Sequence, residues 1–308
     1  MQIYLPIADL PVNVFVILAM GLAVGFISGM FGIGGGFLMT PLLIFLGITP
    51  AVAVASVTSH IAASSMSGAS SYWRRRAIDL ALAFMLLAGG IVGTAFGVWL
   101  FTFLRTIGQL DITIGVSYVV LLGIVGALMV AESMRAIIRA RQGKPIELRR
   151  PGSHTWIHGL PFKLRFKRSR IYVSAIPVWG IGFLIGFIGA VMGIGGGFLL
   201  VPLLIYVLRV PTSTVIGTSM VLTLVTMASA TVMHAVTNHL VDALLALILM
   251  VGGVIGAQFG ARAGQKMSGE RLRLLLGLLV LAVGIRFALN LILPPETLYS
   301  IRLLDTNL

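Results

Sequence analysis

The sequence GIGGGFLMTPLLI at residues 32–44 returns as GIGGGFLLVPLLI at residues 193–205, 161 positions later. The similarity extends into the flanks, because fourteen of the twenty residues in 25–44 are identical to their counterparts in 186–205. Shared apolar composition does not produce that many identities, so the chain consists of two homologous halves. Glycine costs about 1 kcal/mol and proline about 3 kcal/mol at a helix-interior position. Three consecutive glycines followed by a proline therefore predict a broken helix in each half.

The composition predicts a membrane protein. Hydrophobic residues make up 58% of the chain and charged residues 10%, and the mean hydropathy is +1.06, whereas soluble domains carry about 25% charged residues. Long apolar runs alternate with short polar breaks, which is typical of a polytopic helical protein and not of a transmembrane barrel. No secretory signal peptide is expected in the first residues. The absence of cysteine excludes disulfides and thiolate metal sites.

Ten hydrophobic segments are predicted, five in each half. They are residues 12–31, 35–47, 51–73, 78–104 and 112–138, then 173–192, 196–208, 212–238, 243–265 and 271–293. A helix needs about 20 apolar residues to span a bilayer, so the second segment of each half, 35–47 and 196–208, is too short to cross upright. These two segments either cross obliquely or re-enter, and charge does not separate the two cases.

Charge placement predicts that the two halves have opposite orientations in the membrane. Residues 135–170 hold eleven Lys or Arg and one Glu, and residues 74–76 are an arginine triplet, so both stretches are expected in the cytoplasm. The N-terminus, with Asp9 and no basic residue, is expected outside. In the second half, the turn at 237–239 has no permanent positive charge, whereas four basic residues fall between 262 and 273. Homologous halves whose positive charges favour opposite orientations in the membrane indicate inverted-topology repeats.

The fold expected is an all-α polytopic protein of the bacterial inner (plasma) membrane. Its parts would be an N-terminal transmembrane repeat at 1–138, a basic cytoplasmic linker at 139–172 and a C-terminal transmembrane repeat at 173–308. The net charge of +13 is attributed to this orientation and to anionic lipids at the linker, and no nucleic-acid partner is expected. A homodimer is left open. His154 and His158 have helical metal-ligand spacing but no acidic or sulfur partner, so no metal or cofactor is expected.

The two glycine breaks form the candidate substrate site. A helix that starts after a break at membrane depth offers free N–H groups and a partial positive charge, which together bind an anion without a charged side chain. Close helix packing is the alternative role for such glycines, and recurrence of the whole motif favours the anion site. The donors expected are Gly34, Gly35, Gly36, Gly195, Gly196 and Gly197.

A polar cluster follows each break, and its members are Ser56, Thr58, Ser59 and His60 in the first half and Gly217, Thr218 and Ser219 in the second. We expect Thr58, Ser59, Thr218 and Ser219 to bond the oxygens of the anion, although such hydroxyls often bond only to the preceding helical turn. His60 would titrate or bond an oxyanion.

Two other recurring features have structural interpretations. Four-spaced glycines at 89, 93 and 97, mirrored at 252, 256 and 260, are predicted to be helix contacts. Asp79 and Asp242 begin the fourth segment of each half and are predicted to stabilise helix N-termini. No catalytic set and no phosphate-binding loop accompany them, so an enzyme is not expected.

The doubled motif resembles the TauE/SafE family of sulfite-exporter-like bacterial membrane transporters, over about residues 12–293. The Gly217-Thr218-Ser219 element adds to the resemblance, and the first half departs from it with Val57-Thr58-Ser59-His60. The resemblance implies export of small sulfur-containing anions such as sulfite or sulfonates, by alternating access around a site at the membrane midplane. The alternatives are a passive anion channel, an importer of a different oxyanion, an intramembrane enzyme and a membrane assembly partner.

Overall fold

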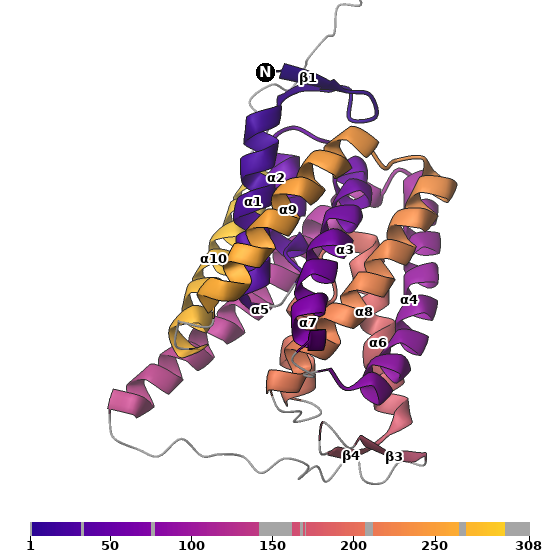
Figure 1. The fold of residues 1–308 in the computed structure, drawn as a ribbon. Coiled ribbons are helices and arrows are strands. Elements are labelled where there is room, and N and C mark those ends of the chain that lie inside the picture. Colours follow the sequence, from indigo (N-terminus) through magenta and orange to yellow (C-terminus); the bar gives the residue numbers. More distant parts are fainter. Residues whose placement is uncertain are drawn as a thin grey trace, which may run out of the picture.

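The computed structural model describes residues 2–31, 34–74, 78–141, 162–166, 169, 171–206, 212–264 and 269–292. This part of the chain is a bundle of helices with two short β-hairpins (Figure 1). The first half contains β1 (Gln2–Leu5), β2 (Leu10–Asn13), α1 (Val14–Phe31), α2 (Gly36–Phe45), α3 (Pro50–Arg74), α4 (Leu80–Thr106) and α5 (Leu110–Arg141). The second contains β3 (Lys163–Phe166), β4 (Ile171–Ser174), α6 (Ala175–Met192), α7 (Gly197–Tyr206), α8 (Thr212–Met233), the π-helix η2 (His234–Asn238), α9 (Ala243–Gly264) and α10 (Gly269–Ile292).

The ten predicted segments correspond to the ten α-helices, so the prediction of an all-α polytopic membrane protein is confirmed. Among the described helices, α1, α4, α5, α6, α8 with η2, and α9 have spans long and apolar enough to cross a membrane. Large apolar side chains are exposed on these helices, for example Phe84 at 74% and Leu128 at 59%. A surface of this kind is expected where lipid covers the protein.

The short helices α2 and α7 re-enter. Gly47, just after α2, lies beside Leu10 in the strand that precedes α1, because a methyl group added to Gly47 would be 3.8 Å from Leu10 Cδ1. In the second half, Leu204 of α7 packs in one cluster with Phe166 and Val173, which precede α6. Each pair, α1–α2 and α6–α7, therefore turns back to the side on which it began (Figure 1).

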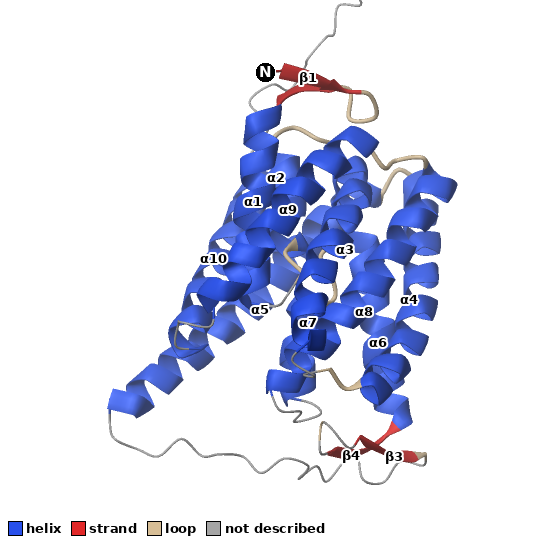
Figure 2. Cartoon of the chain, in the orientation of Figure 1, coloured by secondary structure: helices blue, strands red, loops and turns tan. Residues whose placement is uncertain are grey.

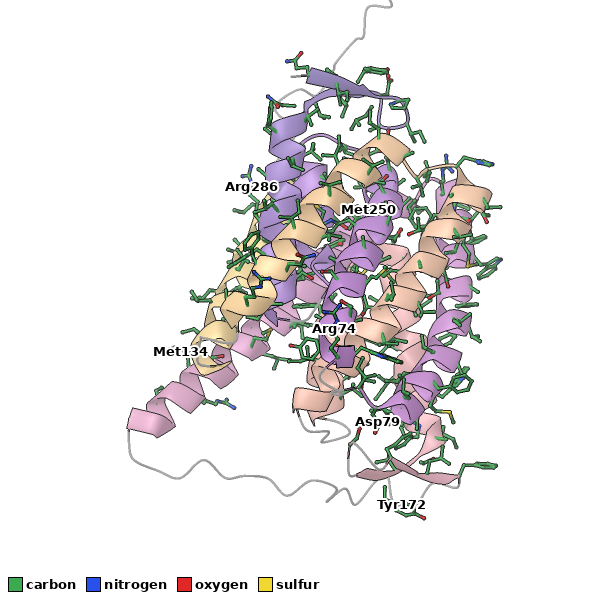
Figure 3. The ribbon with its side chains drawn as sticks, in the orientation of Figure 1. Arg74, Asp79, Met134, Tyr172, Met250 and Arg286 are labelled. Atoms are coloured by element: carbon green, nitrogen blue, oxygen red, sulfur yellow. The ribbon has the colours of Figure 1, made fainter. Side chains whose placement is uncertain are left out.

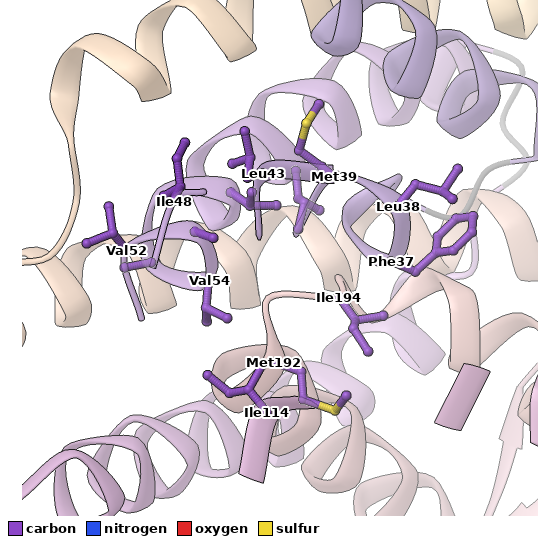
Figure 4. Packing of buried hydrophobic residues seen from close by; sticks show 14 of the residues in the cluster. Phe37, Leu38, Met39, Leu43, Ile48, Val52, Val54, Ile114, Met192 and Ile194 are labelled. Carbon is purple, nitrogen blue, oxygen red and sulfur yellow. The ribbon is translucent and has the colours of Figure 1, made fainter. Parts of the chain in front are cut away.

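The tips of the two re-entrant pairs meet inside the bundle. Phe37 of α2 stacks on Phe198 of α7, its counterpart in the repeat, with ring centroids 4.6 Å apart. Both side chains are buried. Figure 4 shows Phe37 next to Ile194 of the second break. The two halves are thus joined tip to tip around this pair of rings.

The halves also interlock along their lengths, because α1 packs on α9 and α4 packs on α6. Glycines make these contacts close. A methyl group added to Gly89 would lie 2.1 Å from Trp179 O, and one added to Gly256 would lie 2.1 Å from Leu22 O. Methyl groups added to the other four-spaced glycines, at 93, 97, 252 and 260, would lie 1.9–2.7 Å from facing backbone oxygens. Their prediction as helix contacts is confirmed.

The two β-hairpins lie at opposite ends of the bundle (Figure 2). Strands β1 and β2 pair antiparallel with Gln2 opposite Asn13, and β3 and β4 pair with Lys163 opposite Ser174. The sequence analysis did not predict these strands, since four residues are too few for a visible alternation. Below, the two ends are called the β1–β2 face and the β3–β4 face. Residues 142–161 of the predicted linker, including His154 and His158, lie outside the described residues.

Candidate functional site

The first glycine break has a backbone that other residues adopt only under strain. Gly34 and Gly35 have φ angles of 83° and 70°, in the left-handed region that favours glycine. Gly35 is the N-cap of α2, and its carbonyl accepts the N–H groups of Leu38 and Met39 at 3.2 and 3.3 Å. The N–H groups of Gly36 and Phe37 precede these bonds and form the positive end of the helix dipole.

The second break repeats this arrangement with small differences. Gly193 ends α6 with φ of 64°, and Gly195 has φ of 76°. The carbonyl of Gly196 accepts the N–H of Leu200 at 2.9 Å, so α7 also points its N-terminus toward the tip. The helix starts with Gly197, the third glycine of the triplet.

Both breaks converge on Ile61 and Thr223. A methyl group added to Gly34 would lie 3.1 Å from Ile61 Cγ2 and 3.2 Å from Thr223 Cγ2. Gly195 faces Ile61, and Gly196 faces the Oγ1 atom of Thr223. Ile61 is the twelfth residue of α3 and Thr223 the twelfth of α8. The breaks therefore meet near mid-depth of the two helices that run through the centre of the bundle.

Two hydroxyls at this meeting point have no partner. Thr223 Oγ1 and Ser65 Oγ are fully buried and make no hydrogen bond within the described part of the chain. The Thr223 oxygen would be 3.5 Å from a methyl group added to Gly196, and the Ser65 oxygen 3.7 Å from one added to Gly34. Leaving a buried hydroxyl unpaired costs about 1–3 kcal/mol. Such groups call for an explanation, and hydrogen bonding to a substrate during transport is one.

The hydroxyls predicted from sequence have other partners. Thr58, Ser59 and Ser219 donate to the preceding turn of their own helices, at 2.6–2.8 Å, and Thr58 also accepts from Thr231 at 2.8 Å. Thr218 accepts the N–H of Asp79 at 3.2 Å. The structure does not bring these four hydroxyls against the glycines, whereas it brings Thr223 and Ser65 there. Sequence reasoning missed Thr223 because it sits in no recurring motif.

His60 lies beside this site on α3 and is fully buried. Its Nδ1 atom is 2.7 Å from the carbonyl oxygen of Leu249 on α9. Its ring also packs on Gly253, because a methyl group added there would lie 2.3 Å from His60 Cε1. The Nε2 atom has no partner among the described residues.

Hydroxyls from the first half hold the second break. Tyr118 of α5 donates to Met192 O at 2.7 Å, and Thr40 of α2 donates to Gly193 O at 3.2 Å. These carbonyls belong to the C-terminal end of α6, where helix geometry leaves acceptors unpaired. The two bonds therefore fix the position of the second break relative to the first half.

The aspartates that begin α9 and α4 each hold a β-hairpin of the opposite half. Asp242 accepts the N–H groups of Leu244 and Leu245 at 3.1 Å, as an N-terminal cap does, and also those of Ile7 at 3.0 Å and Ala8 at 3.4 Å in the β1–β2 turn. Its own N–H donates to Ser56 at 3.0 Å. We call this set the Asp242 clamp.

Asp79 repeats the same arrangement at the other end of the bundle. It accepts the N–H of Leu82 at 3.2 Å, and the N–H and hydroxyl of Ser169 in the β3–β4 turn at 2.9 and 2.7 Å. Its own N–H donates to Thr218. Figure 3 shows Asp79 at the β3–β4 face, near the hairpin that carries Tyr172. The predicted role of both aspartates at helix N-termini is confirmed, and their bonds to the hairpins are an additional finding. We call the bonds of Asp79 the Asp79 clamp.

The two clamps show which residues of α3 and α8 occupy equivalent positions in the two halves. Ser56 and Thr218 have the same role, so α3 and α8 are related by 162 positions. The sequence comparison had placed Thr218 opposite Thr58, two residues away. With the observed correspondence, Ile61 matches Thr223 and His60 matches Leu222.

Within the described residues, the helices around the breaks place no charged side chain at the meeting point. Helices α1, α2 and α8 contain no Asp, Glu, Lys or Arg, and α3 has only Arg74 at its end. What remains is a pair of helix N-termini and neutral hydroxyl groups, in surroundings that strengthen electrostatic interactions. This arrangement favours an anion over a cation.

Comparison with known proteins supports a role in membrane transport. A family model described as sulfite exporter TauE/SafE matches residues 17–287. The "Probable membrane transporter protein YunE" of Bacillus subtilis (strain 168) is 24% identical over 279 residues, which cover 88% of this chain and 96% of that protein. A "Probable membrane transporter protein" of Xylella fastidiosa (strain 9a5c) is 29% identical over 283 residues, covering 89% of this chain and 94% of that protein. No solved structure matches the chain.

Proposed function

Because the chain belongs to the sulfite exporter TauE/SafE family, we propose that this membrane transporter exports small sulfur-containing anions such as sulfite or sulfonates. The observation that carries the proposal is the meeting of two glycine breaks beside two unpaired buried hydroxyls. The N–H groups at Gly34, Gly35 and Gly36, with their counterparts at Gly195, Gly196 and Gly197, would hold the anion. Thr223 and Ser65 would donate to its oxygens.

The predicted roles of Thr58, Ser59, Thr218 and Ser219 become secondary in this proposal. In the closed arrangement their hydroxyls are engaged. They would reach the anion only after exchanging those partners when the bundle opens.

The proposed mechanism is alternating access. Inverted repeats generate two related conformations, each open to one face. The Asp242 clamp lies at the β1–β2 face and the Asp79 clamp at the β3–β4 face, and each would act as the gate of its face. Release of one clamp at a time would open the site to one side. The side chains of Ile61 and Thr223 fill the meeting point, which favours a carrier over a permanently open channel.

The proposed orientation places the β3–β4 face in the cytoplasm of a bacterial cell, at the inner membrane. Arg74 and Arg135 lie near the ends of helices that run to this face, and Arg262 lies in the last turn of α9, which starts at the opposite face. The positive-inside rule assigns such an end to the cytoplasm. Contact of the basic linker with anionic lipids, and a homodimer, stay predictions.

The charge of the substrate favours export when the anion crosses alone. An anion that leaves a cell with a negative interior gains about 2.3 kcal/mol per charge per 100 mV. This term acts on any anion that crosses without a compensating cation.

The test is a counterflow assay with purified protein in liposomes. Sulfite, thiosulfate, methanesulfonate and sulfoacetate are compared with sulfate, acetate, choline and glucose as unlabelled solutes on the far side. We expect sulfite or the sulfonates to accelerate the exchange of the transported anion most. The Thr223→Val substitution should weaken that acceleration. A response to choline or glucose alone would contradict the proposal, and flux without countertransport would assign a channel.

A further inference from the structure

The imidazole of His60 has one satisfied nitrogen and one unsatisfied nitrogen in the interior of the bundle. A carbonyl oxygen only accepts hydrogen bonds, so the 2.7 Å contact with Leu249 O places a hydrogen on Nδ1. In the neutral ring, Nε2 then carries a free lone pair. This atom is fully buried and makes no hydrogen bond within the described residues.

The other repeat fills the same position with leucine. Leu222 is related to His60 by the correspondence of Ser56 with Thr218, and it packs on Gly90 just as His60 packs on Gly253. An apolar side chain therefore satisfies the packing that this position requires. Histidine adds a group that the scaffold does not need, and it leaves a buried polar atom unpaired, which is unfavourable.

Near His60, the Asp242 clamp supplies one carboxylate, because the N–H of Asp242 donates to Ser56 one turn earlier on α3; this carboxylate already accepts four N–H groups. Of the helices packed against α3, α1, α2, α6 and α8 contain no ionisable side chain, and α9 has only Arg262 in its last turn. Helix α3 itself adds Tyr72 and Arg74 near its end.

Helix α5 is the remaining helix packed against α3. Its ionisable residues are Asp111 in its first turn, Tyr118, whose hydroxyl donates to Met192 O, and charged residues from Glu132 onward. An anion held at the breaks would add a negative charge near His60, because the adjacent residue Ile61 contacts Gly34, Gly36 and Gly195. Proton binding at His60 and anion binding at the breaks would then favour each other, and such coupling is reciprocal.

We infer that Nε2 of His60 takes up one proton when the anion binds, so that the transporter moves one proton with each anion. The inference rests on the proposed function of the same site. When the site is open to water, the Nε2 lone pair accepts the proton and Nδ1 keeps its bond to Leu249 O. On the opposite side, the anion and the proton leave together. A monoanion then crosses as an electroneutral pair, and the two concentration gradients replace the membrane potential as the driving force.

The experiment measures protons and anions together, with methanesulfonate because it has no titrating group near neutral pH. In weakly buffered detergent solution at pH 7, its addition to wild-type protein should take up close to one proton per anion bound. In liposomes, methanesulfonate flux should follow an imposed pH gradient and change less than twofold with an imposed potential.

Two substitutions of His60 separate its proton from its packing. His60→Asn keeps a donor for Leu249 O, and His60→Leu installs the residue of the other repeat. Both should bind the anion with no proton uptake, and their flux should become potential-dependent. His234→Asn is the matched control, because His234 is also buried but has both ring nitrogens engaged, with Ala190 O and Asn238. It should keep wild-type proton uptake.

The outcomes are distinct. Wild-type flux that follows the potential without proton movement overturns the inference and leaves the proposed function standing. Undiminished proton uptake in His60→Asn also overturns it. Should both His60 variants fail to fold, the wild-type proton count decides. If the wild type moves no anion under any gradient, the proposed function fails, and the inference fails with it.

Discussion

Helices α3 and α8 occupy equivalent places in the two repeats, and they agree near the clamps but differ near the glycine breaks. Ser56 and Thr218 both accept the N–H of the aspartate that caps a helix of the opposite repeat. Four and five residues further along, His60 and Ile61 of α3 correspond to Leu222 and Thr223 of α8. The positions that agree hold the scaffold, and the positions that differ lie where the substrate is proposed to bind.

A symmetric scaffold therefore encloses an asymmetric site. One helix supplies the unpaired hydroxyl of Thr223, and the other supplies the unpaired Ser65 and the unpaired nitrogen of His60. Each of these groups has an apolar residue at the matching position of the other repeat, namely Ile61, Met227 and Leu222. Substitutions can therefore test the scaffold and the site separately.

The largest effect is expected at the scaffold, where the tips touch. A methyl group at Gly36 would lie 2.3 Å from Ile61 Cδ1 and 2.5 Å from the backbone oxygen of Gly193. Overpacking costs about 1–3 kcal/mol, and more where backbone must move. We expect Gly36→Ala to destabilise the protein by about 3 kcal/mol, measured as a fall of about 10 °C in the unfolding midpoint in detergent.

Gly180→Ala is the control for this substitution. A methyl group there meets nothing within 4 Å, and alanine is favoured over glycine by about 0.5–1 kcal/mol inside a helix. This variant should be as stable as the wild type or more so. Equal unfolding midpoints for the two variants would contradict the tip-to-tip arrangement.

The second effect distinguishes the two faces. Asp242→Ala and Asp79→Ala each remove an N-cap and the bonds to a hairpin, at about 2 kcal/mol each. We expect Asp242→Ala to open the site to the β1–β2 face and Asp79→Ala to open it to the β3–β4 face. Since the chain has no cysteine, a single Thr223→Cys in the site can report the side from which an impermeant maleimide enters.

Asp111→Ala is the control for the clamps, because Asp111 is an exposed residue in the first turn of α5. It should leave the labelling of Thr223→Cys unchanged from both sides. Labelling from the same side in both clamp variants would contradict the assignment of one gate to each clamp.

The third effect is confined to the site. Thr223→Val removes an unpaired hydroxyl, so stability should stay the same or rise slightly, whereas the affinity for the transported anion should fall about fivefold, or about 1 kcal/mol. Thr226→Val is the matched control, because Thr226 is buried on the same helix and its hydroxyl bonds Leu222 O at 2.8 Å. Binding titrations of sulfite and methanesulfonate give the dissociation constant of each anion for each variant. A loss of affinity in Thr226→Val as large as in Thr223→Val would assign the effect to helix packing.

The sequence predicts the scaffold well because repetition and hydrophobicity are local signals. The doubled glycine motif predicted the two breaks, and the apolar runs predicted all ten helices, including α2 and α7. Charge asymmetry predicted the inversion of the repeats. The re-entrant path was not decided, since it depends on where Gly47 and Leu204 lie in space.

The site was only partly predictable, because a hydroxyl's partner is a property of the packed structure. Thr58 and Ser59 look like binding residues in the sequence, yet their hydroxyls are engaged within the bundle. Thr223 looks like one more threonine in a membrane helix, yet it lies unpaired at the meeting point. A search for motifs that recur in both halves finds residues of the scaffold, and it overlooks residues that differ between the repeats.

The last effect tests an asymmetry between the breaks themselves. Thr40 and Tyr118 bond the carbonyls that precede the second break, and the residue matching Thr40 is Val201, which has no hydroxyl. We expect Tyr118→Phe to cost about 1 kcal/mol, which lowers the unfolding midpoint by about 2–4 °C and speeds amide exchange in the last turn of α6. Tyr172→Phe, at an exposed tyrosine of β4, should change neither. Equal effects in the two variants would show that the bond to Met192 O does not hold the second break.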